Sequence, residues 1–404
     1  KKTLHVPDAP FRPGEKPDFS NLELPKAGDA KKPKIMVEPS EIRDLAFSLV
    51  RVLDDKHEAV GPWDPKLDAS VLKKGLRHMS LLRIFDDRML TMQRQGKLSF
   101  YMKSLGEEAV AIAQGMALRS DDILFPSYRQ PGLQFVRGRD IVDMICHCIT
   151  NVKDNVKGRQ MPVHYSWKEG NFVSISSPVG TQFPQAVGCA MASAYKGEDN
   201  VSISWVGDGT AAEGDFHYAL NFASVYKAPV LLNVVNNQWA ISTHKNISSG
   251  GATFAARGIA YDVPSIRVDG NDFLALYSVT SWAAERARKG GGPTFIEVFT
   301  YRGEAHSTSD DPTRYRPKDE WKSWPLGDPI ERLKAHLIGL ETWSEKEQNK
   351  LEKELDALVI KSYKEAEKHG TLSEGPWAPE DTLFEDVYKK PPRHLRKQRQ
   401  EFGF

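Results

Sequence analysis

Short β-rich runs alternate with helix-like segments over the second half of this 404-residue chain, and this alternation constrains the fold more than any other feature. The expected strands lie at 202–207, 229–235, 265–268 and 293–299, and apolar residues that recur every three or four positions predict a long helix at 68–96. The run PVLLNVV is almost continuously apolar, which is typical of a parallel strand buried on both faces. Strands that alternate with helices predict an α/β fold, a doubly wound parallel sheet with helices on both faces.

Three regions of different character divide the chain. Residues 1–39 are rich in proline and have few apolar residues in register, which predicts an extended N-terminal arm. Residues 40–325 carry the expected strands and should form the α/β domain. Its last part, 300–325, is a polar, proline-bearing loop of the kind that is usually functional. Residues 326–404 are expected to form a helical C-terminal region and tail.

Composition argues against several classes of protein. The formal net charge is +1, with no basic patch, so we expect no nucleic-acid partner. No run approaches the roughly 18 apolar residues of a membrane span, and the first residues lack the apolar core of a signal peptide. The cysteines, Cys146, Cys148 and Cys189, have no CxxC spacing, which favours a reducing compartment over disulfides or zinc. We therefore expect a cytoplasmic protein in a bacterium, or a mitochondrial matrix protein in a eukaryote.

Polar residues stand where two of the expected strands end. The strand at 202–207 runs into Asp208 and Gly209, and the next strand ends in Asn236 and Asn237. Because one helix and one strand fit between them, both motifs should lie at the carboxyl edge of adjacent parallel strands, where such sheets bind ligands. A carboxylate and an amide oxygen suit one hard cation, and the glycines beside Asp208 let a phosphate approach the backbone near a helix N-terminus. Either motif alone would be read as a turn, but together they predict Mg²⁺ with a phosphorylated ligand.

The segment GDGTAAEGDFHYALNF, followed by NNQWAIS, resembles the thiamine-diphosphate fingerprint of the alpha subunits of 2-oxo acid dehydrogenases. The similarity covers nearly the whole chain past the arm, and further blocks follow in the family's order, among them RQGKLSFYMKSLGEEA, FPSYRQPG, GRQMPVHY and RVDGND. Within the family, ISSPVGTQ and HSTSDD are similar to the branched-chain enzymes. The alternatives are a pyruvate or acetoin dehydrogenase alpha subunit and, from another class, a non-catalytic nucleotide-binding scaffold subunit.

The resemblance assigns roles to individual residues. It implies that Mg²⁺ binds Asp208, Asn237 and the backbone carbonyl of Trp239. The residues implied to bind thiamine diphosphate are Tyr128, Arg129, Ser177, Val179, Gly209, Thr210 and His306. The potassium loop of the branched-chain family matches Ser176, Pro178, Thr181 and Gln182, although a capped turn before a helix gives a similar pattern and both interpretations stay open. Val235 departs from relatives that carry an arginine on the diphosphate at this position.

The loop at 300–325 should leave its strand at the edge that carries the proposed metal ligands, so His306 can reach the cofactor. The resemblance implies that this histidine contacts the diphosphate and takes part in acyl transfer to lipoate. Arg302 lies in the same loop. Ser307 matches the serine that kinases phosphorylate in mitochondrial relatives, and a phosphate there would add a charge of about −1.5 to −2 beside the diphosphate and disorder the loop.

The implied reaction is oxidative decarboxylation of 3-methyl-2-oxobutanoate and similar branched 2-oxo acids, with acyl transfer to a lipoyl group on the acyltransferase core. In the family, the glutamate that activates thiamine belongs to a separate pyrimidine-binding domain. Only about eighty residues follow the loop, too few for a second large α/β domain. We therefore expect a beta subunit to supply that domain in an α₂β₂ heterotetramer.

Overall fold

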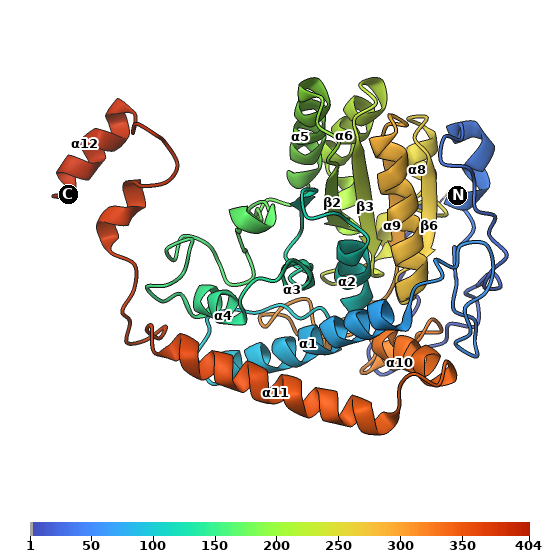
Figure 1. Ribbon diagram of the computed structural model, residues 1–404, viewed down its shortest axis with the longest axis horizontal. Coiled ribbons are helices and arrows are strands. Elements are labelled where there is room, and N and C mark those ends of the chain that lie inside the picture. The colour runs from blue at the N-terminus through green and yellow to red at the C-terminus, as the bar shows by residue number, and fades with distance from the viewer. Residues whose placement is uncertain (1–2) are drawn as a thin grey trace.

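A five-stranded parallel sheet lies at the centre of the computed structural model, which describes residues 3–404 (Figure 1). The strand order is β1-β2-β3-β7-β6, and every neighbouring pair is parallel. The strands are β1 (Ile123–Phe125), β2 (Ser202–Gly207), β3 (Val230–Asn236), β6 (Ser265–Asp269) and β7 (Thr294–Phe299). A small antiparallel pair, β4 (Trp239–Ala240) and β5 (Thr243–His244), follows β3. The four predicted strands are confirmed to within one residue at each end, whereas β1, β4 and β5 were not predicted.

Side chains of one strand alternate between two hydrophobic cores, one on each face of the sheet. In β3, Leu231 and Val235 belong to the first core, while Leu232 and Val234 belong to the second. Residues of α1 (Ala69–Arg94), α2 (Glu108–Met116) and α9 (Phe273–Arg288) complete the first core, and those of α5 (Gln182–Lys196) and α6 (Gly214–Val225) complete the second. Because helices cover both faces, the strand is apolar apart from Asn233 and the terminal Asn236. The predicted doubly wound α/β fold is confirmed.

The helix predicted at 68–96 is α1, whose buried residues form a stripe that includes Leu76, Met79 and Phe85. Asp68 occupies the N-cap position but makes no side-chain capping bond, and Gly96 lies just past the end with φ +75°, a conformation that suits glycine. The remaining α-helices are α3 (Gly132–Arg137), α4 (Ile141–Ile149), α7 (Lys245–Ser248), α8 (Ala256–Ile259), α10 (Pro329–Gly339), α11 (Glu345–Glu367) and α12 (Arg393–Glu401). The 3-10 helices are η1 (Pro39–Ala46), η2 (Lys168–Gly170), η3 (Gly209–Ala212), η4 (Pro312–Arg314), η5 (Glu320–Ser323) and η6 (Glu380–Phe384).

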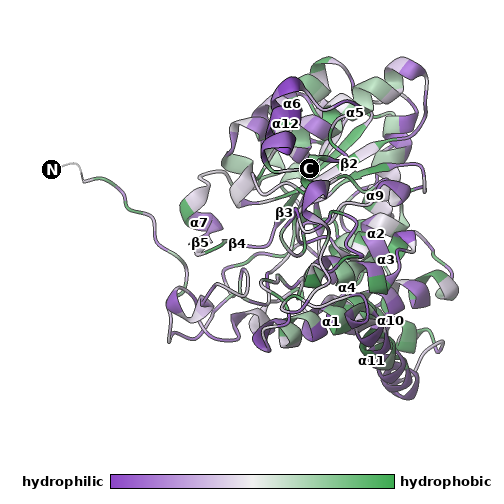
Figure 2. Cartoon of the chain, turned by 90° about the vertical axis from the view of Figure 1, so that its left-hand side faces the viewer, coloured by the Kyte–Doolittle hydropathy of each residue, from purple (hydrophilic) through white to green (hydrophobic). Residues whose placement is uncertain are grey.

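The N-terminal segment carries no helix or strand over its described residues 3–38. Its first residues run away from the body as an extended chain (Figure 2). Further along, the ring of Phe19 packs edge-on against the rings of Tyr301 and Trp324, at centroid distances of 5.9 and 5.4 Å. This part of the segment therefore contacts the chain that follows β7.

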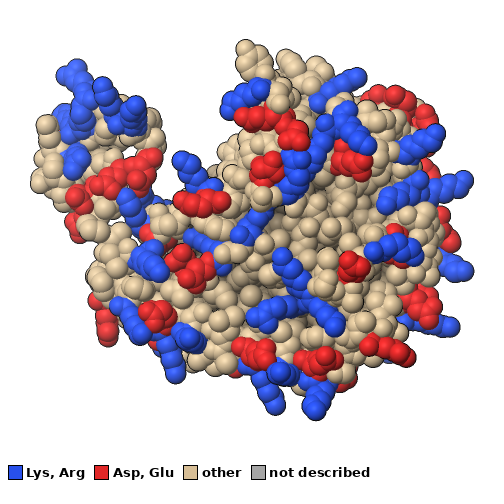
Figure 3. Space-filling model, in the orientation of Figure 1, with Lys and Arg blue, Asp and Glu red and all other residues tan. Residues whose placement is uncertain are grey.

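The C-terminal region begins with α10 and α11, both of which pack along α1. The chain then runs without long helices to α12, which stands away from the body (Figure 1) and carries a group of Lys and Arg side chains (Figure 3). Asp386, on this last segment, pairs with Lys157 and Arg159 at 2.8 and 2.7 Å. The sequence reading predicted a tail here but not α12. Among residues 3–404, no helix has the length and apolar character that a membrane crossing requires.

Candidate active site

A pocket of about 420 Å³ opens at the carboxyl ends of β2 and β3, the edge at which the sequence predicted a ligand. Its lining combines the segment after β1, the loop before α5, the turns after β2 and β3, and the loop after β7. It brings together the residues predicted to bind thiamine diphosphate and Mg²⁺: Tyr128, Arg129, Ser177, Val179, Asp208, Gly209, Thr210, Asn237, Trp239 and His306.

Asp208 follows β2 directly and is only 4% exposed. Its Oδ1 accepts a hydrogen bond from the backbone N–H of Gly209 at 2.9 Å, whereas its Oδ2 is buried without a partner among the described residues. Burial raises the pKa of this carboxyl to about 7. A buried carboxylate oxygen without a partner is costly unless a cation or donor meets it, so this position fits a divalent cation.

Asn237 and Trp239 provide the other predicted metal ligands, from the turn between β3 and β4. The Asn237 Nδ2 donates to Glu107 Oε1 at 2.7 Å, and its Oδ1 accepts from the Trp239 N–H at 3.2 Å. The Trp239 carbonyl already accepts from Arg302 at 2.9 Å, which leaves its second lone pair for a cation. Across residues 3–404, no three His, Cys, Asp or Glu side chains form a metal cluster. The oxygen set of one carboxylate, one amide and one carbonyl suits a hard cation.

Two glycines shape the space beside Asp208. A Cβ added to Gly207 would meet no atom within 4 Å, so the backbone there borders open space. A Cβ added to Gly209 would come within 2.5 Å of the Ala240 Cβ, so only glycine fits against the β4 segment. Thr210 begins the turn that leads to α6, whose N-terminus follows at Gly214. The pocket thus offers open backbone next to a carboxylate, as a metal-bound diphosphate requires.

Arg129 is 4% exposed and connects several parts of the pocket. Its guanidinium donates to the carbonyls of Lys103 and His306, at 2.6 and 3.0 Å, and its Nε lies 3.6 Å from Glu107 Oε1. The ring of Tyr128 meets the ring of His306 edge-on at 5.9 Å. The two residues predicted to bind phosphate therefore also hold the loop after β7 against the pocket.

His306 reaches the pocket from this loop, as predicted. Its Nδ1 lies 3.3 Å from Arg129 Nη2, and its backbone N–H donates to Asp310 at 2.7 Å. Burial, together with Arg129 and Arg302, lowers the pKa of the imidazole to about 3. The ring is therefore neutral at pH 7 before an anion is bound.

Arg302 and Ser307 belong to the same loop but do not line the pocket. Arg302 donates to the carbonyls of Trp239 and Ile241, at 2.9 and 2.8 Å, and to the Tyr315 hydroxyl at 2.8 Å. It therefore ties the loop to the β4 turn that carries a predicted metal ligand. Ser307 is 9% exposed, and its hydroxyl accepts from the backbone N–H of Ser309 at 3.2 Å.

The predicted potassium residues, Ser176, Pro178, Thr181 and Gln182, lie just before and at the start of α5 and do not line the pocket. Thr181 Oγ1 donates to the Pro178 carbonyl at 3.3 Å, and no side chain caps the helix. Gln182 Nε2 donates to the Trp205 carbonyl at 2.8 Å, so its amide oxygen points elsewhere. The intervening Ser177 and Val179 do face the pocket, and the Ser177 hydroxyl lies 3.3 Å from His164 Nδ1.

Sequence reasoning missed several residues of the pocket. Glu107 and His164 lie in blocks that resembled the family, but no role was assigned to either. Val235 lines the pocket with an apolar side chain, so no basic group comes from this position. Gly207, one of the two glycines predicted beside the phosphate, lines the pocket too. The other residues missed are Phe100, Met102, Ser127, Gln130, Met161, Ala240 and Ile241. These residues lie within sequence blocks that resemble the family, but the sequence of a block does not show which of its side chains face the pocket.

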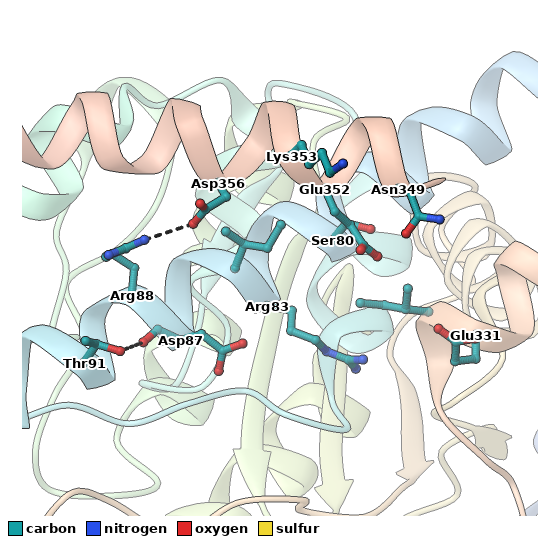
Figure 4. A pocket seen from close by; sticks show the side chains of 12 residues that line it. Ser80, Arg83, Asp87, Arg88, Thr91, Glu331, Asn349, Glu352, Lys353 and Asp356 are labelled. Carbon is teal, nitrogen blue, oxygen red and sulfur yellow. Dashed lines mark hydrogen bonds and ion pairs between the residues drawn. The ribbon is translucent and has the colours of Figure 1, made fainter. Parts of the chain in front are cut away.

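A larger groove, about 590 Å³, lies between α1 and α11, and none of the predicted site residues lines it (Figure 4). On its α1 side, Thr91 Oγ1 donates to the Asp87 carbonyl at 2.8 Å. Across it, Arg88 pairs with Asp356 at 3.0 Å. The groove is larger than the pocket, but the chemistry predicted from the sequence does not converge there.

Comparison with known proteins agrees with the fold and shows the family. Residues 76–374 match the family described as Dehydrogenase E1 component, and residues 2–40 match the family described as 2-oxoisovalerate dehydrogenase E1 alpha subunit N terminal. The chain therefore belongs to the dehydrogenase E1 component family, a family of thiamine-diphosphate-dependent oxidoreductases.

The names of similar proteins specify the kind of dehydrogenase. The chain is 57% identical over 401 residues to the 2-oxoisovalerate dehydrogenase subunit alpha of Pseudomonas aeruginosa, covering 99% of this chain and 98% of that one. It is 38% identical over 369 residues to the mitochondrial human protein of the same name (91% and 81% covered), and 41% identical over 340 residues to that of Caenorhabditis elegans (84% and 77%). The predicted similarity to branched-chain 2-oxo acid dehydrogenase alpha subunits is confirmed.

Proposed function

We propose that this chain is the alpha subunit of an enzyme that oxidatively decarboxylates 3-methyl-2-oxobutanoate and similar branched 2-oxo acids, and transfers the acyl group to the lipoyl group of an acyltransferase core. One observation carries the proposal: Asp208, Asn237, Arg129 and His306, far apart in the sequence, line one pocket at the carboxyl edge of the sheet. The names of the relatives supply the substrate class.

In this proposal, Asp208, Asn237 and the Trp239 carbonyl hold Mg²⁺, and the unpartnered Asp208 oxygen supports that role. The backbone at Gly209 and Thr210, together with Tyr128 and Arg129, binds the diphosphate, while Ser177 and Val179 contact the aminopyrimidine ring. Thiamine diphosphate, when bound, supplies the electron sink for decarboxylation. The protein's part is to hold it in a fixed orientation and to exclude water.

His306 has two tasks in the proposed reaction, to hydrogen-bond a phosphate oxygen and to give a proton to the lipoyl sulfur. The pKa of about 3, which results from burial and from Arg129 and Arg302, opposes the second task. A bound diphosphate raises this pKa, because a nearby anion stabilises the imidazolium. Binding of the cofactor thus prepares the histidine for proton transfer.

The proposal includes a beta subunit in an α₂β₂ assembly. The pocket has apolar side chains at its rim that are open to solvent: Val179 is 42% exposed and Ile241 is 53% exposed. A partner surface that covers this rim would complete the cofactor site. The division into an arm (1–39), an α/β domain (40–325) and a helical C-terminal region (326–404) stays part of the proposal.

Two finer assignments also stay proposals. Potassium binding by Ser176, Pro178, Thr181 and Gln182 is supported by the Gln182 amide oxygen, which the contact to Trp205 leaves available. Phosphorylation at Ser307 requires the loop to open first, because the hydroxyl is buried and bonded within the loop. A phosphate there would repel the diphosphate and keep the loop open.

The test is reconstitution. The chain purified alone should show no decarboxylase activity and bind thiamine diphosphate poorly, whereas the complex with its co-purified partner should bind it with Mg²⁺ and turn over. Comparing kcat/KM for 3-methyl-2-oxobutanoate and pyruvate then separates this function from a pyruvate or acetoin dehydrogenase. Robust turnover by the chain alone would contradict the shared site, and failure of the complex to bind the cofactor would leave only the scaffold alternative.

A further inference from the structure

Glu107 lies in the pocket between the residues proposed to bind Mg²⁺ and those proposed to bind the diphosphate. Neither the sequence pattern nor the resemblance to the family assigns it a role. We propose that Glu107 is a positioning residue, which turns the Asn237 amide toward the cation and fixes the Arg129 side chain beside the diphosphate. This inference rests on the proposed function and deepens it. It concerns how the site is held in place rather than what it binds.

The contact to Asn237 holds the amide in the same orientation that the hydrogen bond from the Trp239 N–H to Asn237 Oδ1 requires. Glu107 Oε1 accepts from Asn237 Nδ2 at 2.7 Å. Because a carboxylate can only accept, the NH₂ end of the amide must face Glu107, and the oxygen end must face away from it. That oxygen is the atom proposed to bind Mg²⁺. An amide rotated the other way would present hydrogens to the cation and repel it.

The same oxygen of Glu107 faces Arg129. The distance from Glu107 Oε1 to Arg129 Nε is 3.6 Å, and the other guanidinium nitrogens are held by the carbonyls of Lys103 and His306. Glu107 is 1% exposed, so its side chain has little freedom to move. One carboxylate oxygen therefore orients a metal ligand and a phosphate ligand that belong to different segments of the chain.

The neighbouring Glu108 provides a matched control. It is fully buried as well, but it turns toward α1, where its carboxylate pairs with Arg83 Nε at 2.7 Å and accepts from the Gly106 N–H at 3.0 Å. It does not line the pocket. Two adjacent buried glutamates thus serve different neighbours, and a general effect of burying a carboxylate would appear at both.

The experiment measures the Mg²⁺ concentration that half-saturates thiamine diphosphate binding to the assembled enzyme, by calorimetry rather than by activity. Glu107→Leu, which removes the acceptor, should raise this concentration by about 10-fold to 100-fold, the range usual for residues that orient metal ligands. Glu107→Gln keeps an acceptor oxygen and should stay within about 3-fold of the unmodified enzyme. Glu108→Gln should leave the half-saturation unchanged while lowering Tm.

Each outcome decides something. If Glu107→Leu binds Mg²⁺ like the unmodified enzyme while Asp208→Ala does not, the positioning role is overturned and the proposed metal site stands. If Asp208→Ala also keeps its Mg²⁺ dependence, the metal site itself is wrong and this inference fails with it. If Glu107→Gln is as impaired as Glu107→Leu, the amide orientation is not the cause and the proposal is overturned. Glu107→Ala carries the same expectation should the leucine variant not assemble.

Discussion

The pocket at the β2–β3 edge and the groove between α1 and α11 differ in how their acidic side chains are satisfied. In the groove, Arg88 and Asp356 pair at 3.0 Å, and both are partly exposed, by 26% and 51%. In the pocket, Asp208 is almost completely buried and one of its oxygens has no partner among the described residues. The groove is the larger of the two, so size alone would not have pointed to the pocket where the predicted site residues meet.

The buried Asp208 oxygen marks one place where the chain does not have the most stable arrangement of its polar groups. Burying a carboxylate without a partner destabilises the folded state, whereas a solvated ion pair has little effect on stability. The unfavourable arrangement lies at the carboxyl edge of the sheet, where the backbone also leaves open space beside Gly207. A bound cation would give the Asp208 oxygen a partner, and a bound diphosphate would occupy the open space.

Asp208→Ala should produce the largest effect and sharpen this contrast. We expect loss of Mg²⁺-dependent cofactor binding, because the carboxylate proposed to bind the cation is gone. The free energy of unfolding should not fall, since the gain from removing the buried Oδ2, which has no partner among the described residues, offsets the loss of the bond from the Gly209 N–H to Oδ1. Calorimetric titration and thermal unfolding of the assembled enzyme measure both quantities. Unchanged cofactor affinity would remove Asp208 from the metal site.

His306→Ala comes next. The fold should be retained while the activity of the complete complex is lost, because the variant lacks the group proposed to donate a proton to the lipoyl sulfur. We expect lipoyl acylation to fall by about 10² to 10⁴, the usual contribution of a general acid, and to fall at least as much as decarboxylation measured with an artificial electron acceptor. Ser309→Ala, an exposed position in the same loop, is the control and should be near normal. Acylation at the unmodified rate in His306→Ala would refute the assignment of the loop.

The carboxyl edge of the sheet was predictable because its signals are local. Apolar strand runs, a Gly-Asp-Gly turn and an Asn-Asn strand end mark β2 and β3, and the two strands are neighbours in the sheet. The approach of the His306 loop followed from the same logic, since β7 pairs with β3 in parallel. Strand β1 has only three residues, too few to show a pattern.

The supporting contacts were not predictable, because they join distant segments. Glu107 and Asn237 are 130 positions apart, and the sequence around Glu107 reads as the start of a helix with two adjacent acids. Nothing in that pattern shows that one glutamate turns into the pocket and the other toward α1. The groove between α1 and α11 was missed for the same reason, since it arises from the packing of two amphipathic helices.

The pH dependence of stability offers a smaller test of the pocket. The pKa of His306 in the folded state, about 3, lies below the ordinary value of 6.5, so the stability that the neutral imidazole contributes is fully present above pH 6.5 and is lost as the pH falls toward 3. Between pH 7.5 and 5.5, the unmodified enzyme without cofactor should lose about 1 kcal/mol more stability than His306→Gln. Urea unfolding at the two pH values measures the difference. Bound thiamine diphosphate should reduce this difference in stability loss. An equal loss of stability in both proteins would mean that the imidazole is not held neutral.

The smallest expected effect belongs to the groove. Arg88 and Asp356 are both partly exposed, so solvent screens their attraction and the side chains lose freedom on pairing. A double-mutant cycle with Arg88→Ala and Asp356→Ala, followed by urea unfolding, should give a coupling energy of about 0.5 kcal/mol or less. Neither substitution should change the Mg²⁺ half-saturation or lipoyl acylation, because no atom of this pair lies in the pocket. If Arg88→Ala changed either one, the groove would be coupled to the proposed cofactor site, and a buried carboxylate oxygen without a partner would no longer be what distinguishes the pocket from the groove.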